Sequence, residues 1–264
     1  MKTVVFQSFR TSNVPDWLER CLQSVREWAS IQGFDYRFVD DRLFEYAPDW
    51  YRQRVKNHVL PVSDLARLVL ARELLGQGYQ RAIWMDADVL VFAPERLRIE
   101  ISREYAFCRE VWTFLGDNGH PHFKVGVNNA VCVFVQPNSL LDFYIHACQS
   151  LMSNKPKPDQ LSVGTHFLTE LDKLMCLPQI MDVGLFSPLL MADIARGTTK
   201  YLKAYLAYHG SRLHAANLCL SWGGQTYDGI EVGDQLFAAV IDNLLHSRGA
   251  VLNQIFAQLQ TARR

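Results

Sequence analysis

The strongest constraint in this chain is a pair of aspartates set within an apolar run. Asp86 and Asp88 are one residue apart, and residues 82–85 before them and 89–92 after them are all apolar. Such a run is typical of a strand buried in a parallel sheet, where an ionised carboxylate is costly unless it pairs or binds a metal. We therefore predict that the strand ends at Met85 and that both carboxylates, at positions i and i+2 of extended backbone, face one divalent cation. A solvated surface turn is the alternative.

The oxygen ligands indicate which cation to expect. Hard carboxylate oxygens suit Mg²⁺ or Mn²⁺, and these ions often take only one or two carboxylates together with the phosphates of a substrate. We therefore expect Mn²⁺ or Mg²⁺ as the cofactor.

Composition narrows the class of protein. The chain has 264 residues, 49% of them hydrophobic and 20% charged, which is enough apolar material for a sizeable core. Lys plus Arg and Asp plus Glu both number 27, so the net charge of zero argues against general nucleic-acid binding. The six cysteines include no CxxC pair, and we expect most of them to be buried, reduced thiols as in a cytosolic protein. No run of about 18 apolar residues occurs, so no membrane span is expected.

Strands and helices alternate through the first part of the chain. Residues 3–6, 35–39 and 82–85 are predicted strands, and residues 15–29 carry apolar side chains at helical spacing. A further helix is predicted to begin at Ser63, acting as its N-cap. This order predicts an α/β fold with a mainly parallel central sheet flanked by helices.

Ligands of such sheets bind beyond the carboxyl ends of the strands. Asp40 and Asp41 follow the second predicted strand, and the aspartates of the 86–88 segment follow the third. We therefore expect the two acidic segments to lie at the same edge of the sheet.

The second half is less regular. We predict a strand at residues 131–135, a polar loop at 154–159 and a fraying tail at 254–264. The predicted helices of this half are residues 140–151, 164–174 and 234–248. No linker divides the chain, so we expect a single domain over residues 1–264.

Several motifs spread over about residues 3–222 resemble one known family. They are Val5-Phe6-Gln7-Ser8-Phe9, Pro15-Asp16-Trp17-Leu18, Phe38-Val39-Asp40-Asp41, Ser63-Asp64-Leu65-Ala66-Arg67, Trp84-Met85-Asp86-Ala87-Asp88, Val163-Gly164-Thr165-His166-Phe167-Leu168-Thr169, Phe186-Ser187-Pro188, and His214 with Ser221-Trp222. Together they resemble the DxD-containing sugar-binding-region glycosyltransferases of the GT-A superfamily. That group includes fungal initiating mannosyltransferases, bacterial capsule and lipopolysaccharide sugar transferases, and the catalytic domains of clostridial glucosylating toxins.

One segment departs from the family pattern. The family usually approaches its metal site through a Gly-Gly-x-Tyr-x-Asp-x-Asp type segment, whereas residues 76–84 here read Gly-Gln-Gly-Tyr-Gln-Arg-Ala-Ile-Trp. Retaining galactosyltransferases of the glycogenin-like type also end a strand in Asp-Ala-Asp, so that neighbouring family stays open.

The resemblance implies a GT-A fold and a metal-dependent, retaining glycosyltransferase. Residues 1–92 would form the nucleotide-sugar-binding half, and residues 93–264 the acceptor-side and C-terminal half. The expected donor is a UDP- or GDP-sugar, and the acceptor is a glycan, a lipid-linked sugar or a protein, as in polysaccharide biosynthesis. A cytoplasmic location is expected, with peripheral association at the inner membrane surface as an alternative.

The resemblance also assigns roles to single residues. The expected catalytic residues are Asp86, Asp88, Asp64 and Arg67. The expected metal ligands are Asp86, Asp88 and His214. The expected contacts to the donor are Gln7, Phe9, Asp40, Asp64, Arg67, Trp84, Asp86, Asn129, Ser221 and Trp222.

Some of these residues have structural alternatives. Asp64 and Arg67 share one face of a predicted helix and would grip donor-sugar hydroxyls, or else serve as a capping carboxylate and a solvated surface cation. Trp222, whose indole N–H suits a phosphate oxygen, is equally compatible with a core position. His214 is either a metal ligand or a packed histidine.

Two other functions are open at this stage. A non-catalytic protein of the same fold that binds a nucleotide sugar or a glycan is one. A nucleotidyltransferase is the other, but residues 7–13 lack the glycines of a phosphate-binding loop.

Overall fold

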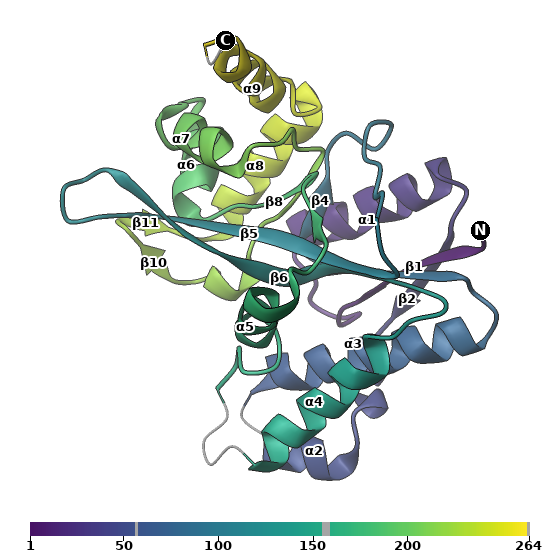
Figure 1. Ribbon diagram of the computed structural model, residues 1–264. Helices are drawn as coiled ribbons and strands as arrows, with labels where there is room; N and C mark the ends of the chain where they lie inside the picture. Colours follow the sequence, from purple (N-terminus) through teal and green to yellow (C-terminus); the bar gives the residue numbers. More distant parts are fainter. Residues whose placement is uncertain (56–57, 155–158, 263–264) are drawn as a thin grey trace.

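The computed structural model describes residues 1–55, 58–154 and 159–262 (Figure 1). The strands are β1 (Thr3–Ser8), β2 (Asp35–Val39), β3 (Arg81–Met85), β4 (Val89–Val91), β5 (Tyr105–Leu115), β6 (Pro121–Val135), β7 (Gln179–Ile180), β8 (Val183–Leu185), β9 (Ala215–Asn217), β10 (Thr226–Tyr227) and β11 (Ile230–Glu231). The α-helices are α1 (Asp16–Ile31), α2 (Asp49–Arg54), α3 (Val59–Gly76), α4 (Leu141–Asn154), α5 (Thr165–Met175), α6 (Pro188–Arg196), α7 (Lys200–His209), α8 (Asp234–Ser247) and α9 (Ala250–Ala262). Two 3₁₀ helices, η1 (Asp41–Tyr46) and η2 (Leu220–Trp222), complete the described elements.

The central sheet is mixed and mostly parallel, which confirms the predicted α/β class. Its strand order is β2-β1-β3-β6-β5-β7. β1 pairs in parallel with β2 and with β3, and β5 pairs in parallel with β7. β6 lies between β3 and β5 and runs antiparallel to both. The strand direction therefore changes between β3 and β6, next to the 86–88 segment that follows β3.

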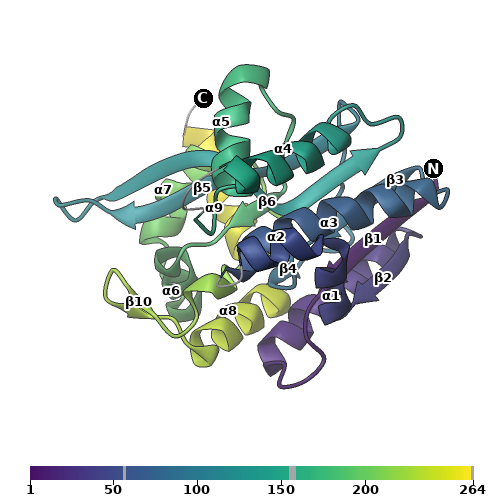
Figure 2. The same ribbon diagram turned by 90° about the horizontal axis from the view of Figure 1, so that it is seen from below.

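Helices cover both faces of this sheet, and side chains that alternate along each strand meet different helices. Val4 and Phe6 of β1 belong to the cluster built on α3, whereas Val5 belongs to the cluster that contains Val25 and Trp28 of α1. Figures 1 and 2 show α1 and α3 on opposite sides of β1. Burial on both faces explains the unbroken apolar runs at residues 4–6 of β1 and 82–85 of β3.

A second, smaller sheet has the order β4-β9-β8. β4 follows β3 after only three residues but belongs to this second sheet, so residues 86–88 form the junction between the two sheets. α6, α7, α8 and α9 surround the second sheet through a cluster that includes Ala216 of β9 and Phe237 of α8.

Three predicted boundaries are wrong. α3 begins at Val59 with His58 as N-cap, so Ser63 lies inside the helix; Pro61 occupies the first turn, where its missing N–H costs nothing. The predicted fraying tail is instead helix α9, whose Leu252 and Ile255 are buried. The predicted strand at 131–135 is the end of the much longer β6.

Parts of two predictions fall outside the described residues, namely positions 155–158 of the predicted polar loop and the last two positions of the chain. Among the residues that the structure does describe, no helix combines the length and the hydropathy that crossing a membrane requires.

Candidate functional site

A cleft of about 730 Å³ lies at the carboxyl end of β3. Its walls come from the end of β1, η1, α3, the 86–88 turn, the facing strands β5 and β6, the start of α5, and η2. The cleft brings Asp64, Arg67, Asp86 and Asp88 into one cavity from two separate parts of the chain.

The two aspartates meet through a tight turn rather than through extended backbone, which corrects the predicted geometry. The Asp86 N–H donates to Ala130 O (2.7 Å), and the Val89 N–H donates back to Asp86 O (3.1 Å). Gln7 Nε2 donates to the same carbonyl oxygen (3.1 Å). Gln7 is fully buried, so its side chain supports this turn. The predicted contact of Gln7 with the nucleotide-sugar donor does not fit this burial.

Asp88 is held on both of its carboxylate oxygens. Asn217 Nδ2 donates to Oδ1 (2.7 Å), and the Leu220 N–H donates to Oδ2 (2.7 Å). Burial and the nearby charge of Asp86 raise the pKa of Asp88 to about 7, although these hydrogen bonds act in the other direction. A bound cation would relieve this repulsion between neighbouring carboxylates.

Asp86 offers a free oxygen to the cleft. Its Oδ1 accepts from Trp84 Nε1 (2.6 Å) and from Arg67 Nη1 (3.0 Å), and within the described part of the chain no group donates to Oδ2. Burial raises the pKa of Asp86, and the charge of Arg67 opposes that rise. One unpartnered carboxylate oxygen beside a second carboxylate is a donor set that fits Mg²⁺ or Mn²⁺.

Arg67 lies at the centre of the buried polar network. Its guanidinium is within hydrogen-bonding distance of five acceptors: Asp86 Oδ1 (3.0 Å), Asn129 O (2.9 Å), Ser63 O (3.2 Å), Ser63 Oγ (3.2 Å) and Asp64 Oδ1 (3.1 Å). A guanidinium has five N–H donors. Four of the five contacts are hydrogen bonds and the fifth, to Asp64, is an ion pair, so most of the guanidinium N–H groups are engaged within the protein. Arg67 also lies 4.7 Å from the centre of the Trp84 ring.

The Asp64 carboxylate meets its partners among the described residues, Asn129 and Arg67, through Oδ1. Asn129 Nδ2 donates to its Oδ1 (2.8 Å), and a side chain at Gly164 would come within 2.6 Å of its Oδ2. Burial raises the pKa of Asp64 to about 6, with Arg67 opposing. Asn129 thus contributes by orienting Asp64, and both residues line the cleft.

His214 does not lie with the two aspartates, which corrects the predicted metal site. β9 pairs with β4 so that Asn217 is opposite Val89, next to Asp88, while His214 precedes β9 and its carbonyl accepts from Phe92 N (3.1 Å). Three residues of strand, about 10 Å, therefore separate His214 from the cleft end of β9. In residues 1–55, 58–154 and 159–262, no three His, Cys, Asp or Glu side chains converge as a metal site.

The remaining predicted donor contacts divide into two groups. Phe9, Trp84, Ser221 and Trp222 line the cleft. Asp40 does not, because its carboxylate caps η1 and pairs with Arg42 (2.8 Å), while its neighbour Asp41 faces the cleft instead.

The cleft also contains residues that no sequence motif singles out. Asn217 is one, since only the long-range pairing of β4 with β9 places it beside Asp88. Glu110, Trp112 and Lys124 are others, contributed by β5 and β6. The local sequence indicates only that Glu110 and Trp112 would share one face of a strand, and it does not indicate that this face lines the cleft.

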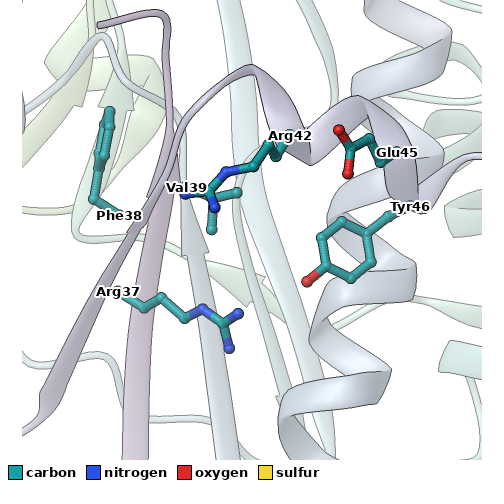
Figure 3. A pocket seen from close by; sticks show the side chains of 6 residues that line it. All are labelled: Arg37, Phe38, Val39, Arg42, Glu45 and Tyr46. Carbon is teal, nitrogen blue, oxygen red and sulfur yellow. The ribbon is translucent and has the colours of Figure 1, made fainter.

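A second hollow, of about 390 Å³, lies between β2 and η1. Figure 3 shows Arg37 reaching from β2 toward Tyr46, with Arg42 and Glu45 on the adjacent turn. None of the predicted site residues lines it, and it lacks the paired carboxylates of the larger cleft.

Comparisons with known proteins give similar structures but no similar sequences. No protein-family model and no curated protein sequence matches the chain. A glycosyltransferase involved in glycosylation of the major capsid of PBCV-1 has a TM-score of 0.47 at 12% identity, covering 82% of this chain and 92% of that one. Mouse xyloside xylosyltransferase 1 in its apo form has a TM-score of 0.46 at 10% identity, and the match covers 83% of this chain and 98% of that one. The galactosyltransferase LgtC in complex with donor and acceptor sugar analogues has a TM-score of 0.40 at 12% identity, and the match covers 82% of this chain and 87% of that one. These three are glycosyltransferases, but the function of this chain has to be argued from its own cleft.

Proposed function

We propose that the protein is a metal-dependent, retaining glycosyltransferase that moves a sugar from a nucleoside-diphosphate donor to an acceptor. The observation that carries this proposal is the carboxylate pair at the 86–88 turn, which lies at the end of β3 in a cleft of about 730 Å³. Asp86 and Asp88 would hold the divalent cation, Mn²⁺ or Mg²⁺. When bound, such a cation neutralises charge on the leaving diphosphate.

The other buried groups have distinct tasks in this proposal. Asp64 accepts a hydrogen bond from a hydroxyl of the donor sugar through Oδ2, the oxygen not shared with Asn129. Arg67 is a positioning residue, because its ion pairs fix Asp64 and Asp86 relative to each other. Phe9 lies at the β1 end of the cleft, where the nucleotide base would stack.

The transfer itself exchanges one bond for another. The bond between the anomeric carbon and the diphosphate oxygen breaks, the acceptor oxygen bonds to that carbon, and the acceptor proton passes to the departing diphosphate. Positioning and charge stabilisation by the cleft lower the barrier.

Ligand-dependent stability tests the proposal directly. We expect UDP or GDP to raise the melting temperature with Mn²⁺ but not with EDTA, because a ligand at a hundredfold excess over its Kd adds about 2.7 kcal/mol to stability. Asp88→Ala should abolish the shift. Asp142→Ala is the matched control, since Asp142 is an exposed carboxylate paired with Arg72 on the surface.

Activity assays separate the remaining functions. Sugar transfer or donor hydrolysis that needs Mn²⁺ and yields the donor's anomeric configuration supports the proposal. Binding without any turnover would favour a non-catalytic nucleotide-sugar-binding protein, and turnover that survives replacement of both aspartates would contradict the metal site.

A further inference from the structure

The β5–β6 hairpin places a polar and aromatic surface at one end of the cleft. Glu110 and Trp112 are two residues apart on β5 and share a face, and Lys124 of β6 is the register partner of Trp112. All three line the same cleft as Asp86. Figures 1 and 2 show this hairpin projecting beyond the helices around it.

Aromatic contacts hold the indole of Trp112 in place. The rings of Trp112 and Trp222 are stacked, with centroids 5.7 Å apart and an interplanar angle of 24°. Trp112 Nε1 donates to the hydroxyl of Tyr227 (2.7 Å), and Tyr227 also meets Trp222 edge to face. The Leu115 N–H donates to Asp228 (3.0 Å), which fastens the β10–β11 hairpin to β5. The surface is therefore preorganised and loses little freedom when a ligand binds.

Glu110 retains a free oxygen in this position. Asn128 Nδ2 donates to its Oε2 (3.0 Å), and no other donor to its carboxylate occurs among the described residues. Burial raises the pKa of Glu110, while the bond from Asn128 and the positive charges of Lys124 and His166 oppose that rise. An oriented carboxylate of this kind accepts hydrogen bonds from hydroxyl groups.

The topology separates this surface from the donor end of the cleft. Asp86 ends β3, and β6 lies between β3 and β5 in the sheet. Glu110 is thus two strand spacings, about 10 Å, from the line of β3. Phe9 and Asp41 lie on the other side of β3, at the end assigned above to the nucleotide.

We propose that Glu110, Trp112 and Lys124 form the acceptor subsite and that the acceptor is a saccharide. This inference rests on the proposed transferase function and names its acceptor class. The apolar C–H face of a pyranose ring would stack on Trp112, while its hydroxyls would donate to Glu110 and accept from Lys124. The carboxylate of Glu110, the ammonium of Lys124 and the indole of Trp112 together match the mixed apolar and hydroxylated surface of a sugar. A lipid chain would instead need a continuous apolar groove.

Saturation-transfer NMR tests this inference with defined probes. Methyl α- and β-glycosides of glucose, galactose, mannose and N-acetylglucosamine are added to the full chain with UDP or GDP and Mn²⁺, and aromatic protons are irradiated. We expect at least one glycoside to receive saturation on its C–H face. Trp112→Ala and Glu110→Gln should each weaken its binding at least about tenfold, and Trp112→Phe should retain a partial signal.

Controls keep the two proposals distinguishable. Trp50→Ala removes a partly exposed indole of α2 outside the cleft and should leave the signal unchanged. The Trp112 and Glu110 variants should keep the nucleotide-dependent melting shift, which shows that the fold and the donor end are intact.

Two outcomes would overturn the saccharide subsite while the donor site stands. One is nucleotide binding without saturation of any glycoside, and the other is saturation of a serine- and threonine-containing peptide in place of glycosides. Failure of every nucleotide to bind would instead contradict the proposed function itself.

Discussion

At the residue scale, the site depends on the buried guanidinium of Arg67, which forms ion pairs with two carboxylates. The Arg67 side chain is 6% exposed and contacts both Asp64 and Asp86, so removing it would leave two poorly hydrated negative charges. Burial alone would lower the pKa of Arg67, but the charges of Asp86 and Asp64 raise it, which keeps the guanidinium charged.

Arg67→Ala should therefore destabilise the fold strongly. Breaking a buried ion pair by removing one partner costs about 3–5 kcal/mol, whereas an exposed pair contributes about 1 kcal/mol or less. Arg72→Ala is the matched control, since Arg72 lies on the same helix and forms an exposed pair with Asp142. Urea denaturation of both variants measures the difference. Equal losses would mean that the buried network is not what Arg67 supports.

A second pair of residues distinguishes the corrected metal site from the predicted one. Asn217→Ala removes the donor to Asp88 Oδ1, and loss of such a supporting contact typically weakens metal binding by about 10–100-fold. His214→Gln should leave Mn²⁺ affinity unchanged, because His214 is outside the cleft. Titration of Mn²⁺ with a bound nucleoside diphosphate measures both. A large loss in His214→Gln alone would restore the histidine as a ligand.

At the element scale, close approach of the loop before α5 to α3 shapes the donor-sugar end of the cleft. Gly164 lies against Asp64, with space for no side chain between them. By contrast, Gly76 at the end of α3 faces open space.

The two glycines give opposite predictions. In Gly164→Ala the added methyl would lie 2.6 Å from Asp64 Oδ2 and 3.1 Å from Asn129 Nδ2, so the carboxylate must move. We expect weaker donor binding and a loss of about 1–3 kcal/mol in stability. Gly76→Ala should keep activity and gain up to about 1 kcal/mol, because alanine favours the helix. Donor titration and thermal unfolding compare them, and unaltered donor binding in Gly164→Ala would argue against a role for Asp64.

The local residue pattern predicts an element well where the residues of that element alone determine its structure. The predicted bounds of β2 are confirmed, because its strand pattern is bounded by a turn on one side and by acidic residues on the other. The predicted fraying tail is wrong because Leu252, Ile255 and Leu259 lie on one helical face and pack against the cluster that contains Phe237.

Long-range pairing accounts for what the sequence could not provide. The Asp86–Asp88 turn was visible as carboxylates in an apolar run, and Asp64 with Arg67 as neighbours on a helix. Asn217 and Glu110 reach the cleft only through the pairing of β9 with β4 and of β5 with β6, which no local spacing encodes.

At the scale of the whole molecule, stability must respond to pH through groups far from the cleft as well. His209 ends α7, is 1% exposed, and stacks on Tyr205. Its Nε2–H donates to Met181 O (2.8 Å), and among the described residues its Nδ1 has no partner, so the neutral ring fits the site and a second proton does not.

Burial lowers the pKa of His209 in the folded protein, and this direction fixes the sign of its contribution to stability. Below the unfolded value of about 6.5, the unfolded chain binds a proton that the folded chain excludes, so stability falls as pH falls. Between pH 7.5 and pH 5.5 this group should cost up to about 1.4 kcal/mol, because pH 5.5 is about one unit below the unfolded pKa. His209→Gln keeps a side-chain N–H but cannot titrate. The stability of the native protein relative to this variant, measured by urea denaturation at both pH values, should therefore decrease at pH 5.5. If the difference in unfolding free energy between the native protein and His209→Gln is unchanged or larger at pH 5.5, His209 binds its second proton in the folded state and α7 adjusts its structure to accommodate that proton.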